Sequence, residues 1–110
     1  MKELAEGKGT HDFTVSGIVK IVEDNSINKK DCLGKIVVVK SPDPSIVMAI
    51  RNSIGVIAET GGLTSHVAIV CQELNLPAIV GVDNIVSMLH DGDFITMTSS
   101  DHEGIIYEVD

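Results

Sequence analysis

Short apolar runs place the strongest limit on what this chain can fold into. Residues 35–40 enclose four consecutive aliphatic side chains, and two more apolar runs follow at residues 54–59 and 78–80. A continuous run of this kind, without polar alternation, is typical of a strand that is buried on both faces. The sequence therefore predicts buried strands with other segments packed on both sides of them, which is an α/β fold.

Helical patterns lie between and after these strands. Asp43 suits the N-cap position and Pro44 the first helical position, so a helix is predicted to follow them and to end near residues 53–55. A second helix is predicted over residues 65–75, where apolar side chains lie nearly all round, so most of its surface should be buried. A short helix is expected at residues 84–89.

The remaining segments complete one domain. Residues 13–21 alternate between apolar and polar side chains and predict the first strand, whereas residues 93–98 and 104–109 predict an antiparallel pair. Residues 1–10 are polar and glycine-containing, which favours a mobile tail or an interdomain linker. We therefore expect the domain itself to span residues 11–110.

Charge and hydropathy exclude several functions. Eight basic and sixteen acidic residues give a net charge of −8, which argues against a nucleic acid or an anionic membrane as a partner and favours an electropositive protein surface. The first nine residues lack an apolar core, and no apolar run approaches the length that spans a membrane. A cytoplasmic location is expected.

The cysteines and most of the histidines suggest no chemistry. Cys32 and Cys71 are far apart in sequence and predict two reduced thiols. His11, His90 and His102 stand in separate polar, turn-like settings and are expected at the surface. No spacing typical of zinc ligands occurs, so no metal site is predicted in this chain.

His66 is different, because a glycine turn and a helix start coincide there. Gly61 and Gly62 allow a tight turn after the preceding strand, Thr64 suits the N-cap, and His66 then lies in the first helical turn. A helix start offers unpaired N–H groups and the positive end of the macrodipole, which favour an anion such as phosphate. The same field favours a neutral ring whose free nitrogen can attack an electrophile.

The stretch Gly61-Gly62-Leu63-Thr64-Ser65-His66, with further matches through residue 81, resembles the phosphohistidine swivelling domain of the phosphoenolpyruvate-utilising enzymes. That family includes pyruvate phosphate dikinase, phosphoenolpyruvate synthase and enzyme I of the sugar phosphotransferase system. The resemblance extends over nearly the whole chain. It implies a three-layer β/β/α swivelling fold in which the histidine at the position of His66 carries a phosphoryl group between two remote active sites.

The resemblance also assigns roles around the nucleophile. It implies that the phosphoryl group is supported by residues of the turn and the helix start, namely Gly61, Gly62, Thr64 and Ser65. Thr64 is compatible with capping and with a phosphate contact, and Ser65 is equally compatible with an ordinary first-turn role. Glu59 is a further candidate, although a solvated carboxylate at the end of a strand is its alternative interpretation.

Two positions depart from the family pattern. Gln72 stands where the family usually has an arginine beside Glu73, and Val67 replaces a commonly smaller residue. The missing arginine leaves the nucleophile intact but removes a charge contact to phosphate or to a partner domain.

The functional hypothesis is a phosphoryl-carrier domain of a phosphotransferase that forms phosphohistidine at His66 and is not a complete enzyme alone. The resemblance implies partner domains, in the same gene product or in trans: a nucleotide-binding domain and a barrel that binds phosphoenolpyruvate or pyruvate. It places ATP or phosphoenolpyruvate, and Mg²⁺, in those partners, and no cofactor in this chain. A non-catalytic interaction or regulatory module that retains the fold stays open as the alternative, and Gln72 is its main support.

Overall fold

The computed structural model describes residues 1–22, 29–41 and 50–109, and one mixed sheet dominates this part of the chain. Its seven strands are β1 (Lys2–Gly9), β2 (Phe13–Val22), β3 (Ile36–Val39), β4 (Gly55–Ala58), β5 (Ala78–Val80), β6 (Phe94–Ser100) and β7 (Glu103–Glu108). The described helical segments are the 3₁₀ turn η1 (Lys29–Cys32) and the short helices α2 (His66–Glu73) and α3 (Ile85–Met88). The fold is thus mixed α/β and mostly β.

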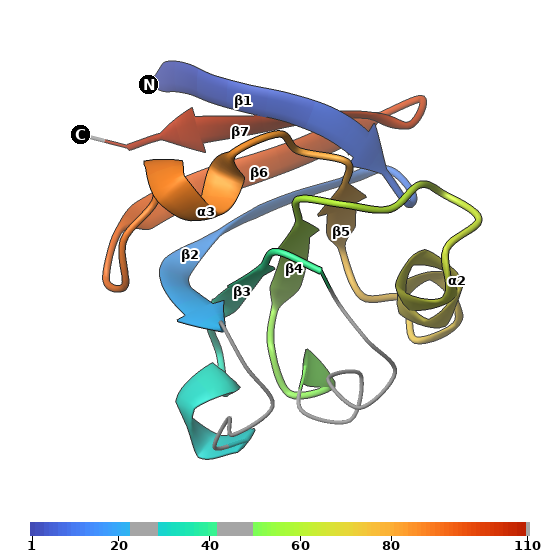
Figure 1. Ribbon diagram of the computed structural model, residues 1–110, viewed down its shortest axis with the longest axis horizontal. Coiled ribbons are helices and arrows are strands. Elements are labelled where there is room, and N and C mark those ends of the chain that lie inside the picture. Colours follow the sequence, from blue (N-terminus) through green and yellow to red (C-terminus); the bar gives the residue numbers. More distant parts are fainter. Residues whose placement is uncertain (23–28, 42–49, 110) are drawn as a thin grey trace.

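The sheet closes on itself. Its strands follow the order β1-β5-β4-β3-β2-β6-β7, and β7 pairs with β1 to complete a barrel. The strands β2, β3, β4 and β5 run parallel, whereas all pairings that involve β1, β6 or β7 are antiparallel. Figure 1 shows the long antiparallel strands on one side of the barrel and α2 standing apart on another side.

Two apolar clusters explain why the parallel strands read as continuous apolar runs. Every residue of β3, β4 and β5 is buried, and alternate side chains enter different clusters. Val37, Val56 and Val80 join the cluster that includes α2, whereas Val38 and Ile79 join the one between the parallel strands and β6 and β7. The prediction of strands buried on both faces is confirmed.

Residues 2–9 form a strand of the sheet, so the expectation of a mobile tail over residues 1–10 is wrong for them. They form β1, whose register with β7 pairs Lys2 with Glu108 and Lys8 with Glu103. On the other edge of β1, Lys8 pairs with Val80 of β5 and Gly9 pairs with Ile79. The segment looks unstructured in sequence because its side chains are polar, yet its backbone supplies the hydrogen bonds that two neighbouring strands would otherwise lack.

The other predicted elements agree with the structure in position but not always in burial. The antiparallel pair is β6 and β7, the short helix is α3, and the helix predicted over residues 65–75 is α2. The expectation that α2 is buried nearly all round is wrong, because Ile69 is 44% exposed and Leu74 is 41% exposed. The helix predicted after Asp43 and Pro44 lies almost wholly outside the described residues, and Ile50 near its end is buried.

Asp91 lies in the turn that precedes β6, and its carboxylate connects this turn with β2. Its Oδ1 accepts a hydrogen bond from the Ile21 N–H at 2.6 Å, and its Oδ2 lies 3.5 Å from Lys20 Nζ. The Ile21 N–H, assisted by the charge of Lys20, holds the pKa of the Asp91 carboxyl below its usual value. The ionised form is therefore favoured by folding.

We expect Asp91→Asn to lower the free energy of unfolding at neutral pH by less than about 1 kcal/mol, because the carboxylate is largely exposed. The folded pKa lies below the unfolded one, so the contribution of the charge is complete above about pH 4 and is lost as the pH falls through the folded pKa. Urea unfolding of both proteins across this pH range should show that the difference between their free energies of unfolding becomes smaller in acid. A difference that grows in acid would contradict the assignment.

Candidate functional site

The carboxyl ends of β3 and β4 hold the start of the loop that leads to α2. The N–H of Thr60 donates to the carbonyl oxygen of Lys40 at 3.1 Å, and the Thr60 hydroxyl donates to the same oxygen at 3.1 Å. The Ser41 and Thr60 hydroxyl oxygens are 3.2 Å apart. These bonds fix the chain at the residue before the glycine turn.

The two glycines of the turn differ in what they require. Gly61 has a φ of +103°, which favours glycine, and a Cβ there would lie 3.3 Å from the Ser65 hydroxyl oxygen. At Gly62 a Cβ would meet no atom within 4 Å. Backbone geometry therefore explains Gly61, whereas the absence of a side chain at Gly62 leaves open space beside the helix start.

Ser65, and not Thr64, caps α2. Ser65 has an extended backbone, and its hydroxyl accepts the Ala68 N–H at 3.4 Å while its carbonyl accepts the Ile69 N–H at 3.0 Å. The Ser65 N–H donates to the Gly62 carbonyl at 3.0 Å, which closes the turn. This bond moves the helix start one residue beyond the predicted cap, and Thr64 is left exposed.

His66 is the first residue of α2, and its side chain is exposed. Among the described residues, the backbone N–H groups of His66 and Val67 donate to no acceptor. An exposed imidazole thus lies beside two unpaired donors at the positive end of a helix, an arrangement that suits an anion held next to a nucleophile. Ile69 lies three residues further on, on the same exposed face.

Glu59 does not join this group in the structure. Its Oε1 accepts a hydrogen bond from the Val86 N–H at 3.0 Å, in the first turn of α3. One carboxylate oxygen therefore satisfies an N–H that the start of α3 leaves without a helical partner. The alternative interpretation of a purely solvated carboxylate is also incomplete, because the side chain is only half-exposed.

The other histidines lie elsewhere. His90 and His102 are exposed, as predicted, whereas His11 is half-buried with its ring edge against Phe13 at a centroid distance of 5.3 Å. His11 Nδ1 lies 3.0 Å from the Thr10 hydroxyl, and His102 Nδ1 lies 2.8 Å from the Gly9 carbonyl oxygen. Both rings therefore contact the corner between β1 and β2.

Both cysteines are free and buried, so the prediction of two reduced thiols is confirmed. Burial raises the pKa of the Cys71 thiol to about 11 and, together with the charge of Asp31, raises that of Cys32. A thiol held in its neutral form is a poor nucleophile. Among the described residues, no three His, Cys, Asp or Glu side chains gather in a group that could hold a metal ion.

Sequence reasoning missed the part that β1 plays beside α2. The Gln72 side-chain amide donates to the carbonyl oxygen of Thr10 at 3.5 Å, which joins the helix to the end of β1. Thr10 is itself buried, and its N–H donates to the Ala78 carbonyl at 3.0 Å. No local signal reveals this contact, because it joins residues that are 62 positions apart.

The fold and this helix start place the chain in a known class. The model of the family described as "PEP-utilising enzyme, mobile domain" matches residues 33–101. The chain therefore belongs to that family of phosphoryl-transfer proteins. Within the ranges that the structure describes, no helix has both the length and the apolar character needed to cross a membrane.

Relatives support the assignment along almost the full chain. A pyruvate kinase of Staphylococcus saprophyticus is 37% identical over 107 residues, which are 96% of this chain and 18% of that protein. A probable phosphoenolpyruvate synthase of Methanothermobacter thermautotrophicus is 32% identical over 105 residues, 96% of this chain and 15% of that protein. An NMR structure of an enzyme I protein has 28% identity and a TM-score of 0.60, and the match covers 73% of this chain and 34% of that one. The chain thus spans less than a fifth of either curated relative.

Proposed function

We propose that this chain is a phosphoryl-carrier domain in which His66 takes up a phosphoryl group at one partner site and releases it at a second. The observation that carries the proposal is the exposed imidazole at the first position of α2, beside two unpaired backbone N–H groups and an open glycine turn. The family membership supports it. We further propose that the arrangement is the three-layer β/β/α swivelling fold, because α2 and the antiparallel strands pack on opposite faces of the parallel strands.

This chain takes part in two steps, the transfer of a phosphoryl group to His66 and its transfer away from His66. The lone pair of a neutral His66 ring nitrogen forms a bond to phosphorus while the bond from phosphorus to the leaving group breaks, and the leaving group keeps that electron pair. The donor is a phosphoanhydride or an enol phosphate held by a partner. In the second transfer an acceptor oxygen attacks phosphorus and the ring nitrogen leaves with its electron pair. Turn and helix-start residues stabilise the phosphoryl oxygens through N–H groups.

The partners in this proposal are a nucleotide-binding domain and a phosphoenolpyruvate- or pyruvate-binding barrel, in the same gene product or in trans. They supply ATP or phosphoenolpyruvate and the Mg²⁺ that neutralises its charge, because positioning and charge neutralisation dominate phosphoryl transfer. The short span of this chain relative to the pyruvate kinase and phosphoenolpyruvate synthase relatives is consistent with such an arrangement. A cytoplasmic location is part of the same proposal.

We expect one phosphoryl adduct, on His66, when the chain is incubated with a competent partner domain and its donor. The reason is that His66 is the one histidine placed at the start of a described helix, whereas His11 and His102 contact the β1–β2 corner. Intact-mass and peptide mass spectrometry under conditions that preserve acid-labile phosphate would locate the adduct. An adduct on His11, His90 or His102 instead would overturn the assignment.

Two other results would favour different functions. Binding to the same partners without any adduct would favour the non-catalytic interaction or regulatory module. Sustained cleavage of many ATP equivalents by the purified chain alone would contradict a carrier, because a carrier needs a partner to position the nucleotide. Slow labelling by a reactive small donor is compatible with the proposal, since a neutral imidazole is nucleophilic without help.

A further inference from the structure

We propose that Lys8, at the end of β1, is the cation of this chain that faces the phosphoryl group on His66. The inference rests on the proposed function and adds one residue to it. It begins from the distribution of positive charge: all eight Lys and Arg residues lie between Lys2 and Arg51. The segment that contains the glycine turn, α2 and β5 has none, so a cation at this site must come from another element.

The register of β1 places Lys8 on the side of the sheet that α2 covers. Lys8 pairs with Val80 of β5 and with Glu103 of β7, and residues opposite each other in neighbouring strands share a face. Val80 belongs to the apolar cluster that contains Val67, Ala68 and Cys71 of α2. The side chain of Lys8 therefore leaves the sheet on the face where α2 lies.

Two contacts set the position of Lys8 along α2. Near the end of the helix, Gln72 donates to the Thr10 carbonyl oxygen, and Thr10 lies beside Ala78 at the start of β5. Because β1 and β5 are antiparallel, Lys8 lies opposite Val80, two residues further along β5 than Ala78. Lys8 is therefore further than Thr10 from the end of the helix that Gln72 occupies. The next residue, Gly81, borders the glycine turn, because a Cβ on it would lie 3.2 Å from the Gly61 carbonyl oxygen. Lys8 is thus on the side of the helix start.

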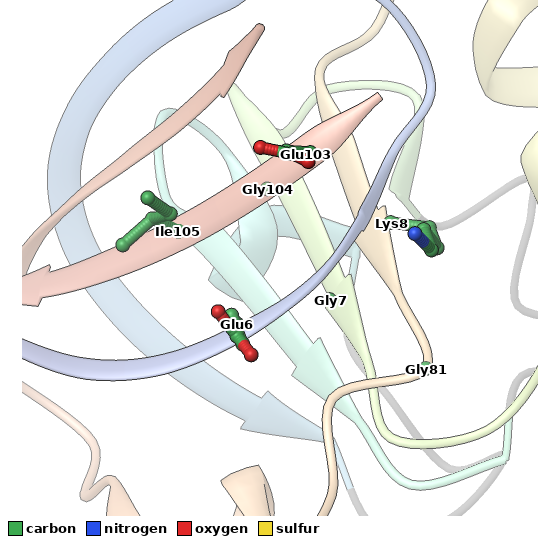
Figure 2. Close-up of a pocket in the computed structure, with 7 residues that line it drawn as sticks. All are labelled: Glu6, Gly7, Lys8, Gly81, Glu103, Gly104 and Ile105. Atoms are coloured by element: carbon green, nitrogen blue, oxygen red, sulfur yellow. The ribbon is translucent and has the colours of Figure 1, made fainter. Parts of the chain in front are cut away.

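A cavity of about 330 Å³ lies beside this lysine. Its lining includes Lys8 and Gly81 together with Glu6 and Glu103, as Figure 2 shows. In that view the Lys8 side chain extends away from both carboxylates. Of the described residues, only Lys20 with Asp91 and His90 with Asp93 form ion pairs within 4.0 Å, so the Lys8 ammonium is not paired at that distance with Glu103, its register partner on β7.

The side chain of Gln72 connects α2 to the end of β1. At this helix position the neutral side-chain amide of Gln72 donates to the carbonyl oxygen of Thr10, the residue that follows β1, which is the strand that carries Lys8. Gln72 joins α2 to the end of β1 but carries no charge, and in this proposal Lys8 supplies the positive charge. An ammonium group suits this role because it sits on a flexible stem and acts as a point charge on a phosphoryl dianion.

Phosphoramidate labelling of the purified chain tests the proposal without a partner. In this reaction the His66 ring nitrogen forms the bond to phosphorus, the phosphorus–nitrogen bond of the reagent breaks, and ammonia leaves with the electron pair. We expect Lys8→Met to slow labelling roughly two- to fivefold at low salt, the range typical of exposed charge pairs, and the difference to shrink at high salt. Lys8→Arg should restore the rate.

Lys2→Met is the matched control. Both lysines are exposed residues of β1 and lose the same charge, but Lys2 lies six residues away, roughly 20 Å along an extended strand. We expect Lys2→Met to label at the wild-type rate. Equal rates for the Lys8→Met and Lys2→Met proteins, or a Lys8 effect that is independent of salt, would overturn the role of Lys8. Lys8→Gln provides a second neutral variant if Lys8→Met does not fold.

The two proposals fail in different ways. If wild-type His66 is labelled and the Lys8 variants match it, the carrier function stands and Lys8 has no part in it. If wild-type His66 stays unlabelled while a histidine peptide in the same tube is phosphorylated, both proposals fail. Mass-spectrometric mapping of the adduct distinguishes these results directly.

Discussion

Phosphoryl uptake is expected to disappear when His66 is replaced by alanine. The variant lacks the exposed imidazole at the start of α2 that the proposal makes the nucleophile, and the unpaired N–H groups that remain there cannot form a bond to phosphorus. Stability should change by less than about 1 kcal/mol, because an exposed first-turn side chain contributes little packing. Mass spectrometry of the phosphorylated chain and urea unfolding measure the two effects separately.

His102→Ala is the informative control for this experiment. His102 is also exposed, yet its ring contacts the Gly9 carbonyl oxygen at 2.8 Å on the β1–β2 corner. We expect the His102 variant to be labelled like the wild type and to lose a little stability. If His66→Ala costs several kcal/mol of stability, the histidine has a structural role, and the carrier assignment loses its main support.

The sequence predicts those parts of the fold in which local pattern and tertiary environment agree. The aliphatic runs of β3, β4 and β5 are apolar because both of their faces are covered, so their composition reports their burial directly. The β6–β7 pair follows from two short runs separated by a turn. The position of His66 after a glycine turn and in the first turn of a helix was predictable for the same reason, since both are local signals.

The parts that the sequence did not predict depend on distant partners. Closure of the barrel requires β1 to pair with β5 and β7, which are separated from it by most of the chain. The cap of α2 is Ser65 and not the predicted Thr64, because the Ser65 N–H donates to the Gly62 carbonyl and Thr64 therefore belongs to the turn. The family resemblance made Glu59 a candidate for the site, whereas its carboxylate accepts a hydrogen bond from the Val86 N–H in α3.

The proposed role of Lys8 depends on the same distant pairing. As part of a tail, this lysine would have no fixed relation to His66, and its polar surroundings give no hint of one. In β1 it is held opposite Val80 and beside the cavity that Gly81 lines. A site that looks purely local in sequence thus acquires a neighbour from the other end of the chain.

The second large effect is expected from Gly7→Ala, which tests whether β1 is part of the fold. A Cβ at Gly7 would lie 2.6 Å from the Val80 carbonyl oxygen and 2.6 Å from Val82 Cγ2, so backbone and core must both move. Overpacking of this kind costs about 1–3 kcal/mol, occasionally more, and should lower the melting temperature by roughly 10 °C. Calorimetry or urea unfolding would measure the loss.

Gly62→Ala is the matched control for Gly7→Ala, because a Cβ at Gly62 meets no atom within 4 Å. We expect its stability to stay within about 0.5 kcal/mol of the wild type. The comparison separates a steric effect from the general effect of adding a methyl group to a glycine. A mobile tail would tolerate Gly7→Ala as easily as the open turn tolerates Gly62→Ala. Equal stability of the two variants would therefore show that β1 is not held against β5, and it would also remove the register that places Lys8 beside α2.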